Sequence, residues 1–212
     1  FTLANYQTAL SLGPVRTAMG NSLMLGFGVA SVGVLVMVLL VWIIYRSNLV
    51  GRGSIEYLVM FPQAVPRLVF GLALLWAWLN IPIPIYGTLW LLALAYFTVM
   101  LPLGVRTLAG VVLQIDKSLE ECARVCGAGW VYQIRTVTLP LLKPGILAAW
   151  LLIFMACVRE LGASVFLMGP NAKVIAPSIV NAFATSGTEL TAAMALIQTF
   201  TVLVALVILF RL

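Results

Sequence analysis

The sequence contains no histidine, three cysteines and only six acidic residues among its 212 residues. Without histidine, and with so few carboxylates and thiols, it lacks the side chains from which most transition-metal sites and acid–base pairs are built. It also lacks the G-x4-G-K-[ST] motif of nucleotide phosphate-binding loops. We therefore expect no catalytic residues, no metal site and no cofactor, and any ATP must be bound by a partner subunit.

The three cysteines are too few for a disulfide framework. Cys122 and Cys126 are one helical turn apart, and Cys157 lies in an apolar run. Two thiols at this spacing are compatible with a metal pair, but the simpler interpretation is packing residues in a reducing compartment, which we prefer.

Charge is scarce throughout, at 8% of residues, whereas 63% are hydrophobic and the mean hydropathy is +1.14. A bilayer core of about 30 Å needs about 20 apolar residues of helix, and the apolar runs here are continuous rather than alternating, which favours helices over a β-barrel. We predict an all-α, multi-pass integral membrane protein, with residues 1–212 forming a single domain. Its five predicted spans are residues 22–45, 55–78, 86–105, 145–168 and 190–210.

The distribution of Lys and Arg predicts the orientation, because cytoplasmic loops near helix ends are enriched in them. With the segment 106–144 inside, eight of the twelve basic residues lie on the cytoplasmic side and two lie outside. The eight are Arg46, Arg52, Arg106, Lys117, Arg124, Arg135, Lys143 and Arg211, and the two are Arg16 and Lys173. This bias places the polar segment 106–144 in the cytoplasm.

Local signals predict two short helices in this cytoplasmic segment. Ser118 could form a capping box with Glu121, and Asp116 is an alternative N-cap. The first helix would run to about Cys126 and end at Gly127, which suits the left-handed residue after a helix. The second, residues 130–138, would be ended by Leu139-Pro140, and Pro144 would open the next span. Two short helices across the membrane face predict a docking surface.

The same segment carries the pattern E-x-A-x3-G-x9-(I/V)-x-L-P. It resembles the signature loop of the permease subunits of bacterial ATP-binding-cassette importers that depend on a solute-binding protein. Cys122 stands where a second alanine is usual, and valine replaces isoleucine in the second half. The matched residues are Glu121, Ala123, Gly127, Val137, Leu139 and Pro140.

The resemblance implies the five-helix core of a type I importer permease in the bacterial cytoplasmic (inner) membrane. It implies a cytoplasmic ATPase dimer, a periplasmic or extracellular solute-binding protein and a second permease half, fused or homodimeric, as partners, with no nucleic acid. The loop would dock into a groove of the ATPase, with Glu121 meeting basic residues and Gly127 allowing close backbone approach. The alternatives are an amphipathic loop that merely caps the bundle, a passive channel, which would not need the loop, and a membrane-embedded enzyme.

Four stretches look most like ferric-iron permeases, which often join two such halves in one long chain. They are residues 1–6, 114–116, 139–145 and 159–164. We therefore expect one half of a longer permease, with ferric iron as the solute. Thiamine, phosphonate, polyamines and inorganic anions stay open, because neighbouring branches of the family have similar loops.

Charges inside the spans usually face a cavity or a partner, because charge in lipid is expensive. Arg67 lies in the second predicted span, and Arg159 and Glu160 lie in the fourth. One hypothesis is that they form a gate or electrostatic lining of the translocation pathway. The other is an intramembrane ion pair that fixes the helix bundle and never meets the solute.

Overall fold

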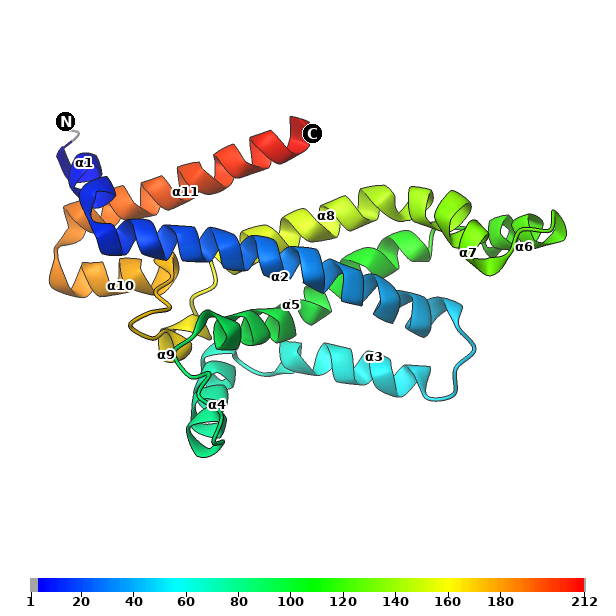
Figure 1. Ribbon diagram of the computed structural model, residues 1–212, viewed down its shortest axis with the longest axis horizontal. Helices are drawn as coiled ribbons and strands as arrows, with labels where there is room; N and C mark the ends of the chain where they lie inside the picture. Colours follow the sequence, from blue (N-terminus) through cyan, green and yellow to red (C-terminus); the bar gives the residue numbers. More distant parts are fainter. Residues whose placement is uncertain (1–3, 212) are drawn as a thin grey trace.

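The computed structural model describes residues 4–211, which form helices joined by turns and loops (Figure 1). Four of the described helices are long and apolar enough to cross a membrane, and a bent pair makes a fifth crossing if it is counted as one span. In chain order the helices are α1 (Ala4–Ser11), α2 (Gly13–Arg46), α3 (Arg52–Met60), a 3-10 turn (Phe61–Ala64), α4 (Arg67–Asn80), α5 (Leu89–Val112), α6 (Lys117–Val125), α7 (Trp130–Gln133), a π-helical segment (Ile134–Thr138), α8 (Leu139–Val158), α9 (Ser164–Leu167), α10 (Ile175–Thr185) and α11 (Thr188–Arg211). The all-α prediction is confirmed.

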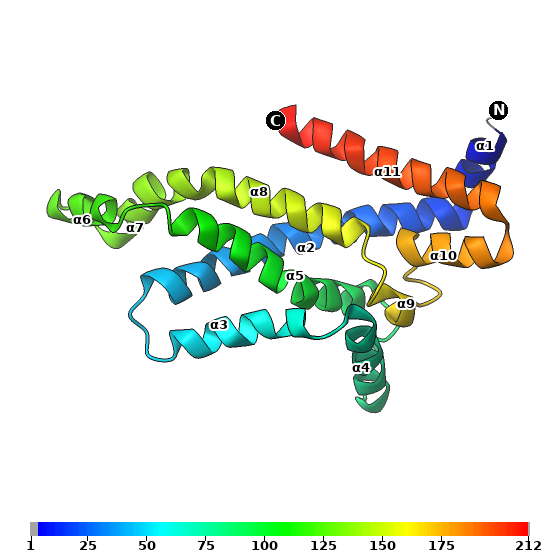
Figure 2. The ribbon, with the colours of Figure 1, turned by 180° about the vertical axis from the view of Figure 1, so that it is seen from behind.

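The core is the three-helix packing of α2, α5 and α8, which run side by side in both views (Figures 1 and 2). Lipid is as apolar as these side chains, so close van der Waals packing must hold the helices together. At Gly26 of α2 an added Cβ would lie 2.9 Å from Val158 Cγ2 of α8. Further along the same contact, the Trp150 indole donates to Ser31 Oγ at 3.0 Å. The close contact at Gly26 and one side-chain hydrogen bond thus hold α2 against α8.

The second predicted span, residues 55–78, is not one straight helix. It divides into α3 with its 3-10 turn and α4, which are bent by 102° relative to each other. Val65 is extended (φ −96°, ψ 126°) and precedes Pro66, whose ring disfavours helical backbone in the residue before it. Arg67 is consequently the first residue of α4, rather than a residue in the middle of a continuous helix.

The fourth predicted span differs at both ends. The chain is helical from Trp130 through α7, the π-helical segment and α8, so Leu139-Pro140 does not end a helix as predicted. The amide of Leu139 bonds to Ile134 O, five residues back, and this wider turn precedes Pro140, which has no N–H to offer. The span ends at Val158 instead of 168, which leaves Arg159 and Glu160 just beyond it.

The other three predicted spans overlap long apolar helices whose ends differ from the predicted ones. The first extends back to Gly13, the third runs from Leu89 to Val112, and the last begins at Thr188. The helical loop α6–α7 lies at one end of the molecule, called the inner end below, with the start of α3; α1 and α10 lie toward the other end, the outer end (Figure 1). Residues 1–3, part of one iron-permease-like stretch, lie outside the described residues.

Hydrogen bonds between side chains and backbone connect the helices at the outer end. Asn21 donates to Lys173 O at 2.9 Å, and the Ile175 amide donates to Ser22 Oγ at 2.8 Å. From α11, Gln198 donates to Val158 O at 3.1 Å, at the carboxyl end of α8. Helices α2, α8, α10 and α11 are therefore connected at the level where α8 stops.

Candidate coupling loop and intramembrane charges

Helix α6 has defined caps at both ends. Asp116 is the N-cap, and its carboxylate accepts from the Ser118 amide at 2.8 Å, so the alternative N-cap is the one that the structure adopts. This backbone hydrogen bond lowers the pKa of the Asp116 carboxyl. At the other end Gly127 has φ +82°, its amide bonds to Arg124 O, and the Ala128 amide bonds to Ala123 O. These two bonds form a Schellman motif, so the predicted end of the helix at Gly127 is confirmed.

The signature residues of the first half lie on an open surface. Glu121 and Gly127 are exposed and Ala123 is half-buried. A Cβ at Gly127 would meet nothing within 4 Å, so within this chain its positive φ, rather than close packing, requires glycine. Helices α6 and α7 also carry exposed apolar side chains: Leu119, Val125, Val131 and Tyr132 are 45%, 88%, 70% and 65% exposed. An apolar surface on a polar loop is typical of a protein docking site.

The second half of the signature begins α8. Val137 is half-buried in the π-helical segment, while Leu139 and Pro140 are exposed in the first turn of α8. A π-helical turn inside a longer helix is rare and is frequent at functional sites. The signature therefore spans two structural parts, the capped helix α6 and the distorted start of α8, joined by α7.

Two charged residues that the sequence analysis did not select connect this loop to the helix bundle. Glu120 is 9% exposed although its neighbour Glu121 is exposed, and its Oε1 lies 3.8 Å from Arg46 Nε at the end of α2. The sequence of α6 offers no signal for this burial, because Glu120 is the buried residue of the helix and its single leucine, Leu119, is exposed. The partner could not be deduced, since Arg46 precedes Glu120 by two membrane spans.

Glu160 is 2% exposed and is bound by backbone. Its Oε1 accepts from the Ala163 amide and its Oε2 from the Ser164 amide, both at 3.2 Å, while Ser164 Oγ donates to Glu160 O at 2.7 Å. The carboxylate thus accepts free amides at the start of α9, where negative charge is favourable. Glu160 therefore has a structural partner that the sequence did not reveal.

Neither arginine of the predicted charge cluster is paired with Glu160. Arg67 and Arg159 are both exposed. The Cβ atom of Arg67 is close to Gly162, where an added Cβ would lie 2.6 Å from it, so α4 reaches the segment between Glu160 and α9. In the described part of the chain, no ion pair within 4 Å joins Glu160 to either arginine. The structure thus brings Arg67 near Glu160 without pairing their charges.

The fold and this loop together define a multi-pass helical membrane protein with an exposed, partly apolar helical loop at its inner end. Residues 37–212 match the family described as "Binding-protein-dependent transport system inner membrane component". The chain belongs to this family. It is therefore a component of a transport system in the inner membrane rather than an enzyme, and the resemblance found in its signature loop is confirmed.

Named relatives fall into several transport systems. The chain is 31% identical over 188 residues to the ABC transporter permease protein y4fN of Sinorhizobium fredii, covering 85% of this chain and 33% of that protein. It is 32% identical over 143 residues to the Fe(3+)-transport system permease protein FbpB 2 of Haemophilus influenzae, covering 66% and 28%. It is 30% identical over 174 residues to a 2-aminoethylphosphonate transport system permease protein, PhnV, of Salmonella paratyphi A, covering 81% and 64%. The chain thus spans about a third of the length of the first two relatives.

Solved structures show the same fold. A bacterial ABC transporter that imports the acidic polysaccharide alginate matches 100% of this chain and 82% of its own chain, with a TM-score of 0.77 and 19% identity. A bacterial alginate ABC transporter in complex with an alginate pentasaccharide-bound periplasmic protein matches 100% of this chain and 81% of its own chain, with a TM-score of 0.77 and 18% identity. At such identities the likeness shows the fold alone, which is that of a type I importer permease.

Proposed function

We propose that this chain forms half of the translocation pathway of an ATP-driven importer. A separate cytoplasmic ATPase dimer binds and hydrolyses the ATP, a solute-binding protein delivers the solute from outside, and a second permease half completes the pathway. Closure of the ATPase dimer moves α6 and, through it, the membrane helices. A passive channel does not require an ATPase-docking loop, which disfavours that alternative.

The observation that carries this proposal is the exposed surface of α6 and α7. It is a capped helix that presents Glu121 and four large apolar side chains, at the inner end and away from the bundle. A helix docks in a partner's groove through such a combination of apolar anchors and one charge. A loop that merely capped the bundle would turn its apolar side chains toward the bundle.

We propose ferric iron as the solute. The support is similarity to FbpB 2 together with the iron-permease-like stretch 159–164, which contains the buried Glu160 and its α9 partners. A phosphonate is the second candidate, because PhnV is similar over a larger share of its own length. The exposed Arg67 and Arg159 would line the pathway in either case, and their positive charge suits an anion or an anion-complexed metal better than a bare cation.

Uptake by the reconstituted full-length system tests both the solute and the arginines. We expect proteoliposomes with the ATPase and the binding protein to take up ferric iron and to ignore 2-aminoethylphosphonate. Arg67→Ala and Arg159→Ala should each reduce uptake about tenfold, equivalent to about 1.4 kcal/mol in the rate-limiting step, with normal assembly. Arg16→Ala, an exposed arginine near the outer end, is the control. Uptake of 2-aminoethylphosphonate instead of ferric iron would show that a phosphonate is the solute. Unchanged uptake rates in the two arginine variants would exclude both arginines from the pathway.

A further inference from the structure

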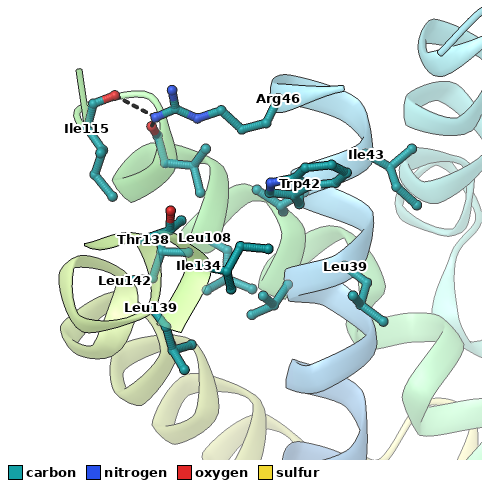
Figure 3. Close-up of a pocket in the computed structure, with 13 residues that line it drawn as sticks. Leu39, Trp42, Ile43, Arg46, Leu108, Ile115, Ile134, Thr138, Leu139 and Leu142 are labelled. Carbon is teal, nitrogen blue, oxygen red and sulfur yellow. Dashed lines mark hydrogen bonds between the residues drawn. The ribbon is translucent and has the colours of Figure 1, made fainter. Parts of the chain in front are cut away.

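The end of α2 makes an unusual set of contacts through one buried guanidinium. The Arg46 side chain is 6% exposed, and its Nη2 donates to Val112 O at 2.8 Å and to Ile115 O at 2.5 Å. Val112 is the last residue of α5, and Ile115 lies in the turn that leads to α6 (Figure 3). Arg46 therefore satisfies carbonyls at the carboxyl end of α5, where positive charge is favourable.

The same guanidinium meets the loop helix. Arg46 Nε lies 3.8 Å from Glu120 Oε1, and the Glu120 side chain is 12% exposed. The rest of the packing of α6 is mainly against α7 and the π-helical segment, not against the long membrane helices. The Arg46–Glu120 contact thus joins α6 directly to α2 and, through the carbonyl bonds, to α5.

A cavity lies beside this junction. Its volume is about 260 Å³, and its walls are apolar side chains of α2, α5, the π-helical segment and α8, among them Trp42, Leu108, Ile134 and Leu142 (Figure 3). It is partly open to the surface, since two of its lining side chains, Leu39 and Leu139, are exposed. The π-helical segment, which connects α7 to α8, forms one wall. The loop therefore meets the bundle in two places, through the π-helical segment, which continues into α8, and through the polar contacts of Arg46.

We propose that Arg46 is the positioning residue that holds α6 in register with α2 and α5, so that movement of the loop reaches the membrane helices. The cavity leaves room for the π-helical segment to shift while Arg46 keeps its contacts. Arginine suits this role because its planar fork can serve two carbonyls and a carboxylate together, whereas a lysine ammonium is a point charge. This role rests on the proposed function, since it needs an ATPase to move the loop.

Two conservative variants of the full-length protein in the assembled transporter test the role. Arg46→Lys keeps the charge but loses the fork, and Glu120→Gln keeps the shape but loses the charge. We expect both to co-purify the ATPase at the wild-type level, while solute taken up per ATP hydrolysed falls at least about fivefold, the lower end of typical coupling between sites. Arg106→Lys, the same change at an exposed position on α5, and Glu189→Gln, at an exposed position at the start of α11, should leave this ratio unchanged.

The possible failures can be told apart. Unchanged uptake per ATP in both variants, with intact complexes, would overturn the positioning role. Loss of the assembled complex in both would also overturn it, because Arg46 would then act in folding. If no ATPase co-purifies with the wild-type protein, the proposed function itself fails. The wild-type co-purification is therefore measured before the variants are compared.

Discussion

Replacement of Gly71 by valine is expected to detach α4 from α9 and to lower the stability of the protein markedly. At Gly71 an added Cβ would lie 2.8 Å from Ala163 Cα and 2.9 Å from Ala163 O, and backbone atoms cannot rotate away as a side chain can. Overpacking of this kind typically costs about 1–3 kcal/mol, and more where backbone must move. We therefore expect the unfolding temperature in detergent to fall by at least about 5 °C.

Gly28→Val is the matched control for this change. Gly28 is a helical glycine of α2 whose added Cβ would meet nothing within 4 Å in this chain. The substitution has the same chemistry and the same effect on helix propensity, so the difference between the two variants isolates the contact with Ala163. Equal unfolding temperatures for Gly71→Val and Gly28→Val would contradict the packing of α4 on α9.

Removal of the Glu160 carboxylate is also expected to lower the stability of the protein markedly. Glu160→Ala leaves the buried amides of Ala163 and Ser164 without their acceptor, and each orphaned group costs about 1–3 kcal/mol. We expect a total loss of about 2–5 kcal/mol, seen as a lower unfolding temperature. Glu160→Gln keeps one carbonyl oxygen to accept one of the two amides, so it should lose roughly half as much.

This series also separates the two hypotheses about the intramembrane charges. If the negative charge of Glu160 served the pathway, Glu160→Gln would impair uptake as severely as Glu160→Ala. We expect instead that uptake follows stability through the series, and that Arg159→Ala, at the exposed neighbour, leaves the unfolding temperature unchanged. A Glu160→Gln protein that is as stable as the wild type but inactive would contradict the capping role and favour the pathway.

The sequence predicts the all-α fold well because continuous apolar runs leave the backbone few alternatives to a helix in lipid. It predicts proline effects poorly. At Pro66 the chain bends by 102°, whereas at Pro140 the helix continues through a π-helical turn. The same steric rule operates at both prolines, so the presence of a proline does not by itself predict whether the helix breaks or continues.

Some features of the candidate site can be predicted from the local sequence, and others cannot. The end of α6 at Gly127 follows from local chemistry, because a positive φ and the Schellman bonds involve residues within one turn. The pairing of Arg46 with Glu120, and the binding of the Glu160 carboxylate by α9, depend on how segments approach in space. No local pattern encodes these contacts. The sequence therefore predicts the exposed helical loop but not the residues that join it to the bundle.

The most direct test of the importer proposal is identification by mass spectrometry of the proteins that co-purify with the full-length protein in mild detergent. The test variant combines Glu121→Lys with Gly127→Val at the inner end. Its control combines Glu189→Lys with Gly187→Val, where the glycine also has a positive φ, of 89°, and the glutamate is also exposed. We predict that an ATP-binding-cassette ATPase accompanies the wild type and the control and is lost from the test variant. An ATPase absent from the wild type, or retained at full level by the test variant, would contradict the account.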